Sequence, residues 1–331
     1  MASTYTSVPI DDIRGFRIGN YTDRAAGTGC TVIVAPEGAT GGVDVRGGAP
    51  ASRETDLLRP ENTVEEVHAV CLSGGSAYGL EAASGVMREL ERRRIGLAVG
   101  PTCVPIVCSS CLFDLAFGDG TVRPGIDAGV EATVDALDGT APCPEGTVGA
   151  GTGATVGKLH GPACAMKGGL GARALEVAGI RVGALAAVNA CGNVHDPLTG
   201  EAIAGMRDAA DGREIVDMED AMFAEAGGLA MPLDRTNTTI SCIITDARLT
   251  KAQATKVAQM AADAYAHAIR PTHTTNDGDT VYVLASGAVE LDVPIDLIGL
   301  AAVRALEEAI GAGCRAADGI CGIPAHKDLA E

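Results

Sequence analysis

The stretch Asn237-Thr238-Thr239-Ile240-Ser241-Cys242-Ile243-Ile244-Thr245 carries the clearest strand signal in this chain of 331 residues. Its density of β-branched residues predicts a β-strand over 238–245. A polar connector with helix-breaking residues, 227–236, leads into it, and an Ala-rich segment, 250–269, follows it. That segment predicts a helix capped by Thr250, and a further strand is predicted over 280–285. This region therefore predicts a strand–helix–strand unit.

The same alternation of strands and helices extends over the rest of the chain. Apolar periodicity predicts helices over 76–94, 126–137, 172–178, 215–225 and 295–316. Short apolar runs predict strands over 32–35, 95–99 and 182–189, while 41–50 is rich in turn residues and 147–158 is a glycine-rich strand or loop. Because no Pro- or Ser-rich linker divides the chain, we expect one α/β domain, 1–331, with layered sheets.

Charge and hydropathy exclude two classes of partner. The net charge is −18 and the sequence pI is near 4.7, so the surface repels phosphate backbones and we expect no nucleic-acid partner. No apolar run approaches the ~20 residues of a membrane span, so we expect no membrane partner. Residues 1–10 lack a basic region followed by an apolar stretch, so we expect no signal peptide.

The cysteine pattern bears on compartment and on metals. Eleven cysteines, an odd number, lie scattered in apolar stretches, which is typical of a reduced, cytoplasmic protein. Cys108 and Cys111 have CxxC spacing, but no second CxxC accompanies them. We therefore expect no metal, with a CxxC redox or metal enzyme kept as an alternative.

The junction Asn237-Thr238 can carry chemistry. A Thr hydroxyl is a weak nucleophile and needs an adjacent base, which the α-amine supplies when Thr is the first residue of a chain. A free α-amine has a pKa near ~8, suited to this role at neutral pH. Thr238 becomes N-terminal only if its hydroxyl attacks the Asn237 carbonyl and water releases the resulting ester. The alternative is an ordinary turn before a strand.

Acidic residues follow 39 residues later, after the predicted helix. Asp277-Gly278-Asp279 precedes the second strand, with His273 nearby. If that strand lies beside the strand of Thr238, the two carboxylates can orient the Thr hydroxyl and amine. The alternative is a solvated turn.

Three further residues are candidates for the same site. Lys158 follows a glycine-rich segment but precedes Leu159, so the Walker pattern is incomplete and we expect no nucleotide cofactor. Lys158 serves either as a fixed cation or as an exposed surface residue. Asn189 closes an apolar strand, as an oxyanion donor or as a turn cap. Tyr78, within Ser73-Gly74-Gly75-Ser76-Ala77-Tyr78-Gly79, lines a pocket or packs on a helix flank.

Taken together, these motifs resemble a family of self-processing hydrolases. The family includes D-aminopeptidase/esterases, β-peptidyl aminopeptidases and endo-type nylon-oligomer hydrolases. The resemblance covers most of the chain and rests on the order and spacing of its pieces. The pieces are Asp44-Val45-Arg46-Gly47-Gly48, Arg53-Glu54-Thr55-Asp56, Cys71 to Glu81, Gly149 to Lys158, Ala187-Val188-Asn189, Asn237 to Ile240, Thr245-Asp246 and His273 with Asp277 to Thr280.

The resemblance implies a fold, a maturation step and roles for site residues. The fold is a four-layer αββα sandwich, similar to N-terminal-nucleophile hydrolases but differently connected. Cleavage gives an α fragment (1–237) and a β fragment (238–331) that assemble as a homo-oligomer, often a tetramer. Thr238 looks like the nucleophile, oriented by Asp277 and Asp279. Lys158 and Asn189 would stabilise charge, Tyr78 would border the substrate, and no cofactor is implied.

One departure indicates the branch of the family. The aminopeptidase members mostly have Gly-Ser at the scissile bond, whereas this chain has Asn237-Thr238 and an Asp-Gly-Asp, which resembles the branch of 6-aminohexanoate-oligomer (nylon) hydrolases. The expected substrate is a small peptide-like molecule or an oligoamide, hydrolysed at an amide bond. The alternatives are an aminopeptidase or β-peptidyl aminopeptidase, and a non-catalytic oligomeric binding protein on the same fold.

Overall fold

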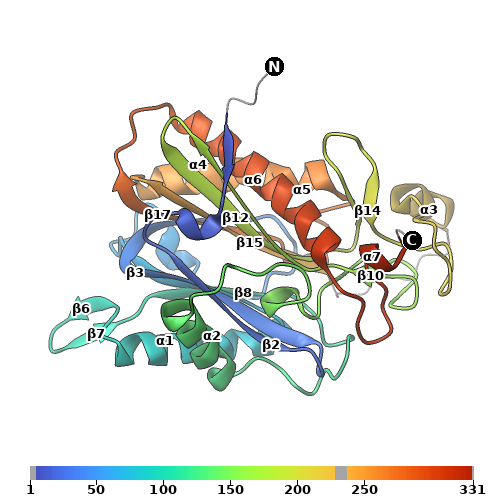
Figure 1. The fold of residues 1–331 in the computed structure, drawn as a ribbon, viewed down its shortest axis with the longest axis horizontal. Coiled ribbons are helices and arrows are strands. Elements are labelled where there is room, and N and C mark those ends of the chain that lie inside the picture. The colour runs from blue at the N-terminus through green and yellow to red at the C-terminus, as the bar shows by residue number, and fades with distance from the viewer. Residues whose placement is uncertain (1–4, 228–236, 330–331) are drawn as a thin grey trace.

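The computed structural model describes residues 5–227 and 237–329. Two β-sheets lie face to face in the centre, and a pair of helical layers covers their outer faces (Figure 1). The order of layers is αββα, as the sequence predicted. Among the described residues, every helix is too short or too polar to cross a membrane.

The first sheet carries the strand predicted from the TTISCIIT run. Its central pair, β15 (Thr238–Ala247) and β17 (Thr280–Val289), is parallel, with Ile240 opposite Thr280. Antiparallel strands flank the pair on both sides, β12 (Ile180–Asn189) beside β15 and the C-terminal part of β3 (Thr28–Val45) beside β17. The sheet is completed beyond β12 by β11 (Leu170–Val177) and β1 (Thr6–Val8).

The long strand β3 belongs to both sheets. Its N-terminal part pairs with β2 (Arg17–Asp23) and with β5 (Val67–Ser73) in the second sheet. That sheet continues through β8 (Val107–Cys111) to β4 (Ser52–Arg53). One strand therefore ties the two layers together.

Three buried clusters correspond to the three interfaces between layers. Ile240, Cys242 and Ile244 of β15 join the cluster between the two sheets, together with Leu72 and Ile33 of the second sheet. The alternate residues of β15 face the helices α4 (Lys251–Ala261), α5 (Asp263–Ala268) and α6 (Ile295–Ala316). On the other side, α1 (Ala82–Arg92) and α2 (Ile126–Asp138) pack on the second sheet. The period-2 pattern of β15 thus decides which side chains point between the sheets.

The smaller elements lie at the ends and edges of these layers. The short helices are η1 (Ile10–Asp12), η2 (Asp56–Leu58), η3 (Ser76–Glu81), η4 (Gly149–Gly151), α3 (Met218–Ala224) and α7 (His326–Leu329). The short strands are β6 (Leu97–Val99), β7 (Thr102–Val104), β9 (Thr155–Val156), β10 (Met166–Lys167), β13 (Asn193–His195), β14 (Ala202–Ala204) and β16 (Ile269–Arg270).

Several sequence predictions are confirmed and two are wrong. Thr250 caps α4 in a capping box with Gln253, and α6 has the bounds predicted for it. Residues 172–178, predicted as a helix, belong to strand β11, because a two-residue turn with positive φ at Ala178 (51°) and Gly179 (76°) folds β11 onto β12. Tertiary pairing here overrides the helix propensity of alanine.

The other wrong prediction concerns residues 41–50. The first part of 41–50 is the end of strand β3, where Gly41 and Gly42 pack against Val67 and the backbone of α4. The helix predicted over 76–94 is present, as the 3-10 helix η3 followed by α1, and it ends at Arg92. The connector expected at 227–236 lies, from residue 228 on, outside the described residues.

Candidate active site

Thr238 is the first residue of β15, at the end of the central strand pair. Its side chain has the same parity as Ile240 and Cys242, so it faces the space between the two sheets. The hydroxyl oxygen donates to the carbonyl oxygen of Asn237 and accepts the backbone N–H of Gly278 at 3.2 Å. The hydroxyl group is therefore held against the carbonyl group of the preceding peptide bond.

Thr239, the neighbouring threonine, faces the opposite side of the sheet. Its hydroxyl is buried toward the helical layer, without a hydrogen-bond partner in the described part of the chain. Its backbone N–H donates to Oδ1 of Asp279 at 2.8 Å. Of the two adjacent hydroxyls, that of Thr238 is the one presented to the space between the sheets.

The loop Asp277-Gly278-Asp279 enters β17 beside Thr238. Asp277 forms an isolated parallel bridge with Asn237, so the loop and the Asn237–Thr238 junction lie side by side. A Cβ atom at Gly278 would come within 2.8 Å of the Thr238 hydroxyl oxygen, so only glycine allows this approach. Asp277 Oδ2 accepts the N–H of Thr274 at 2.6 Å. Burial and the neighbouring Asp279 raise the pKa of Asp277.

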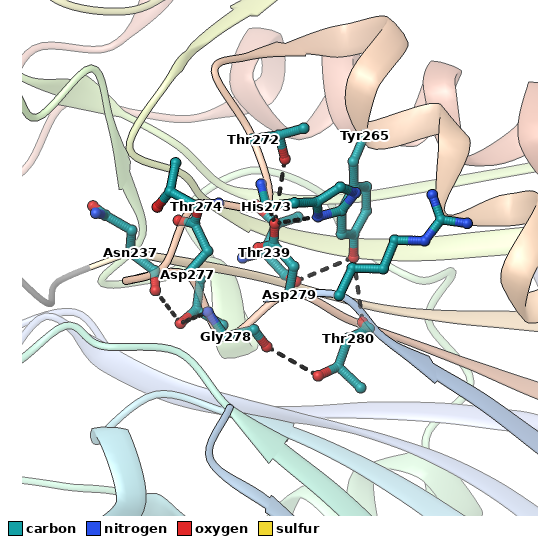
Figure 2. Close-up of polar contacts among 12 residues, drawn as sticks. Asn237, Thr239, Tyr265, Thr272, His273, Thr274, Asp277, Gly278, Asp279 and Thr280 are labelled. Carbon is teal, nitrogen blue, oxygen red and sulfur yellow. Dashed lines mark hydrogen bonds and ion pairs between the residues drawn. The ribbon is translucent and has the colours of Figure 1, made fainter. Parts of the chain in front are cut away.

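Asp279 is held by a cluster on the helical side of the sheet (Figure 2). Its Oδ2 accepts the ring Nδ1 of His273 at 2.8 Å, the His273 backbone N–H at 3.2 Å and the Thr272 hydroxyl at 3.2 Å. Because its Oδ1 takes the Thr239 N–H, Asp279 fixes the peptide that follows Thr238. The hydrogen bonds described for its carboxylate are with that peptide and this cluster, and the hydroxyl of Thr238 lies on the other face.

Tyr265 of α5 fastens the two central strands just behind the site. Its hydroxyl bonds to Ser241 Oγ at 2.7 Å and donates to the carbonyls of Thr239 at 3.1 Å and Thr280 at 3.3 Å. The ring of His273 packs beside it, with the ring centroids 5.5 Å apart. Tyr265 thereby couples α5, β15, β17 and the His273–Asp279 pair (Figure 2).

Asn189 lies at the end of the neighbouring strand β12, and Lys158 lies in the loop that follows β9. Asn189 is the register partner of Thr238 in the β12–β15 pair, and its parity places its side chain on the same face. Lys158 Nζ donates to Asn189 Oδ1 at 2.7 Å and to its carbonyl oxygen at 3.1 Å, and the Thr155 N–H also donates to Oδ1 at 3.0 Å. The structure thus brings Thr238, Asn189 and Lys158 together.

Burial lowers the pKa of Lys158 to about 7, while the nearby carboxylates of Asp277 and Asp114 act in the opposite direction. This lysine therefore changes its charge near neutral pH, unlike a surface lysine. Lysines with pKa values displaced in this way are common at catalytic sites.

Two glycines after β3 shape the acidic loop. The N–H of Ala49 donates to the Asp277 carbonyl at 2.8 Å, and the N–H of Gly48 donates to the Thr274 carbonyl at 3.2 Å. A Cβ atom at Gly47 would meet the Asp277 carbonyl oxygen at 2.3 Å. The Gly-Gly pair was visible in the sequence as part of a motif, but its packing against residues 274–279 was not.

Tyr78 and the CxxC pair lie apart from this cluster. Tyr78, in η3, is 61% exposed, and the guanidinium of Arg123 stacks over its ring at 4.0 Å from the centroid. A role for Tyr78 beside the substrate remains a prediction. Cys108 and Cys111 are three residues apart on β8, so their side chains point to opposite faces of the strand. Among the described residues, no group of three or more His, Cys, Asp or Glu side chains is arranged to hold a metal.

Sequence comparison identifies relatives over nearly the whole chain. The profile of peptidase family S58 matches residues 9–327. An uncharacterized aminopeptidase of Mycobacterium tuberculosis is 42% identical, with 97% of each chain covered. A 6-aminohexanoate-oligomer endohydrolase of Kocuria sp. is 30% identical, covering 85% of this chain and 75% of the relative.

Solved structures share the fold at lower identity. The L-aminopeptidase D-Ala-esterase/amidase of Ochrobactrum anthropi, described as a variant of the Ntn-hydrolase fold, superposes with a TM-score of 0.67 at 20% identity, over 97% of this chain and 92% of that one. A β-aminopeptidase of Burkholderia sp. gives a TM-score of 0.66 at 21% identity, over 98% and 94% of the two chains.

Proposed function

This chain belongs to peptidase family S58 and is an amide-bond hydrolase of the N-terminal-nucleophile type, and we propose that it makes its own nucleophile by cleavage between Asn237 and Thr238. The products are an α fragment, 1–237, and a β fragment, 238–331. The observation that carries the proposal is the contact of the Thr238 hydroxyl with the Asn237 carbonyl at the start of a buried strand.

The maturation step is an N-to-O acyl shift followed by hydrolysis. Thr238 Oγ1 bonds to the Asn237 carbonyl carbon and loses its proton to Asp277, while the Asn237–Thr238 C–N bond breaks and the leaving nitrogen takes a proton. Water then hydrolyses the Asn237 ester. Asn237 gains a carboxylate, and Thr238 gains a free α-amine and recovers its hydroxyl.

Hydrolysis of a substrate repeats this chemistry with the new amine as the base. The α-amine of Thr238 takes the hydroxyl proton as Oγ1 attacks the substrate carbonyl, and the departing amine receives a proton. Water releases the acyl group from Thr238. The ammonium of Lys158, beside Asn189, supplies positive charge next to the reacting carbonyl in both rounds.

Asp279 has a positioning role in this proposal. It orients the Thr238–Thr239 peptide through the Thr239 N–H and is itself fixed by His273. Asp277 and Asp279 therefore have different roles in the proposal. Asp277 lies beside the Asn237–Thr238 bond, and Asp279 lies behind the peptide that follows it. This division follows from two carboxylates in different surroundings.

The substrate is proposed to be a small peptide-like amide or a 6-aminohexanoate oligomer. The endohydrolases at 30% identity favour the oligomer, while the relatives at 42% identity carry the name aminopeptidase and favour a free amino terminus. Amino-acid p-nitroanilides with free and acetylated amino groups, assayed beside 6-aminohexanoate oligomers, distinguish the two. A homo-oligomer, a tetramer in a cytoplasmic setting, completes the proposal and is tested by sedimentation.

The decisive experiment is N-terminal sequencing and intact mass of the purified protein. Two fragments are expected, the smaller beginning at Thr238. A chain that stays whole and inactive after long incubation at neutral pH would instead favour a non-catalytic binding protein.

A further inference from the structure

A small cavity lies beside Lys158. It has a volume of about 80 Å³, and its walls include Phe113, Ala116, Phe117, Pro162 and Ala165, with Lys158 among the polar residues that line it. Four larger hollows of 410 to 840 Å³ open elsewhere, and none of the described residues lining them is a proposed site residue. Of these five hollows, the small cavity is the one that shares a residue, Lys158, with the proposed site.

Two contacts connect this cavity to the nucleophile. Lys158 and Thr155 both line it, and both donate to Oδ1 of Asn189. Asn189 is in turn the register partner of Thr238. The Asn189 side chain therefore links the lining of the cavity to the residue whose hydroxyl is the proposed nucleophile.

Phe117 forms a fixed wall because a second buried lysine holds it. The side chain of Lys167 is fully buried, and its Nζ lies 4.5 Å from the centroid of the Phe117 ring. The same Nζ donates to the carbonyls of Thr152, at 2.8 Å, and Ala154. Gly27 also lies close to the ring, since a Cβ atom there would come within 2.7 Å of Phe117, so the ring has little room to move.

We propose that this cavity, the Phe117 pocket, binds the side chain on the acyl side of the scissile amide, and that the Phe117 wall limits it to a short aliphatic group. The proposal rests on the function proposed above. A cavity of about 80 Å³ is roughly half the size of the ~150 Å³ cavity that holds benzene, so an aromatic ring does not fit. Because the cavity is small, it accommodates only the side chain next to the scissile carbonyl. The amine that departs on hydrolysis lies outside the cavity.

The test is a series of p-nitroanilides of glycine, alanine, leucine and phenylalanine, with kcat/KM as the readout. The wild-type enzyme is expected to prefer alanine over phenylalanine by about 10-fold or more. Phe117→Ala is expected to raise the phenylalanine-to-alanine ratio by about 10-fold. Lys167→Met removes the ammonium that holds the Phe117 ring. It is expected to raise the phenylalanine-to-alanine ratio as well, by a smaller factor.

Ala116→Leu tests the pocket from the opposite direction. Ala116 is exposed at the cavity, so the larger side chain narrows it with little effect on folding. Its kcat/KM for alanine is expected to fall while that for glycine is retained. Ala141→Leu, at an exposed alanine in a different hollow, is the matched control and should leave the series unchanged.

The extent of self-cleavage, read on a denaturing gel for every variant, separates the two proposals. A wild-type chain that never matures overturns the proposed function. Variants that mature like the wild type but keep its substrate ratios overturn the Phe117 pocket. If Phe117→Ala does not fold, the substrate ratios of Phe117→Leu and Ala116→Leu test the Phe117 pocket in its place.

Discussion

Asn189 lies directly opposite Thr238 in the antiparallel pair of β12 and β15, and both side chains face the space between the sheets. The pairing fixes the distance between a carboxamide and a hydroxyl by backbone hydrogen bonds of a central strand. Lys158, in the loop after β9, is joined to this pair by its hydrogen bonds to Asn189. The arrangement makes the Asn189–Lys158 pair part of the sheet scaffold, which is how precise sites are built.

Thr238→Ala is expected to remain a single chain without hydrolytic activity, because the variant has no hydroxyl to attack Asn237. Thr239→Val is the matched control. Its native hydroxyl faces the helical layer without a described partner, so an apolar replacement of similar shape should change the unfolding free energy by less than about 1 kcal/mol. Denaturing gels and intact mass distinguish the two. Cleavage of Thr238→Ala at the same bond would remove Thr238 as nucleophile.

Gly278→Ala is expected to slow self-cleavage by on the order of 100-fold, since displacement of a reacting group by a fraction of an ångström to 1 Å has costs of this size. The added Cβ would lie 2.8 Å from the Thr238 hydroxyl oxygen. Gly125→Ala is the control, because its Cβ would meet only the end of the Glu81 side chain, at 3.1 Å. Cleavage time courses of freshly refolded precursor give the rates. Equal rates for the two variants would contradict the close contact at Thr238.

The rate of self-cleavage is expected to follow a narrow bell against pH. The raised pKa of Asp277 means that this base ionises, and the rate rises, at a higher pH than an ordinary carboxyl would require. Lys158, with a pKa of about 7, loses its charge as the pH rises through that value, so the rate falls on the alkaline side. The precursor isolates these two groups because the α-amine of Thr238 does not yet exist.

Lys158→Arg checks the assignment of the alkaline limb. Arginine stays protonated across the range, so a variant that still cleaves should lack the decline above neutral pH. Rates measured on refolded precursor between pH 5 and 9 provide the comparison. An unchanged alkaline limb in Lys158→Arg would assign it to another group.

Asp279→Asn is expected to slow both maturation and turnover by about 10- to 100-fold, the effect of weakening hydrogen bonds to a buried charge. His273→Leu removes one of the donors to Asp279 and should give a smaller loss in both rates. His273→Asn keeps an N–H donor near the same place, so it should recover part of both rates. Cleavage rate and kcat are measured on the same preparations. If leucine and asparagine behave alike, the His273–Asp279 bond does not position the site.

The sequence predicted those parts of the molecule that depend on local pattern. The strand from Thr238 and the helix ending at Ala316 were predicted correctly. The reasons are the β-branched run of the strand, the regular apolar spacing of the helix, and the turn-forming residues that adjoin each segment. The αββα arrangement followed from the resemblance. Residues 172–178 were predicted as a helix because alanine favours helices, and only their pairing with β12 makes them a strand.

The contacts around the site depend on tertiary packing that no local pattern contains. Tyr265 meets the carbonyls of Thr239 and Thr280 because α5 crosses behind both strands. Asp277 and Asp279 were predicted to act alike on one hydroxyl, yet strand parity places Asp279 behind the peptide. Phe117 and Lys167 passed unnoticed because an isolated aromatic and an isolated lysine carry no signal in a single sequence.

The strand order also determines what becomes of the two pieces after the proposed cut. β15 and β17 both belong to the β fragment, but each is hydrogen-bonded along its outer edge to a strand of the α fragment, β12 on one side and β3 on the other. The β fragment therefore contributes the two central strands of a sheet whose flanking strands belong to the α fragment. It cannot dissociate without breaking the backbone hydrogen bonds of both strand pairs. The nicked protein should migrate as one particle in native separations and unfold in one cooperative transition, with the broken peptide bond visible only under denaturing conditions.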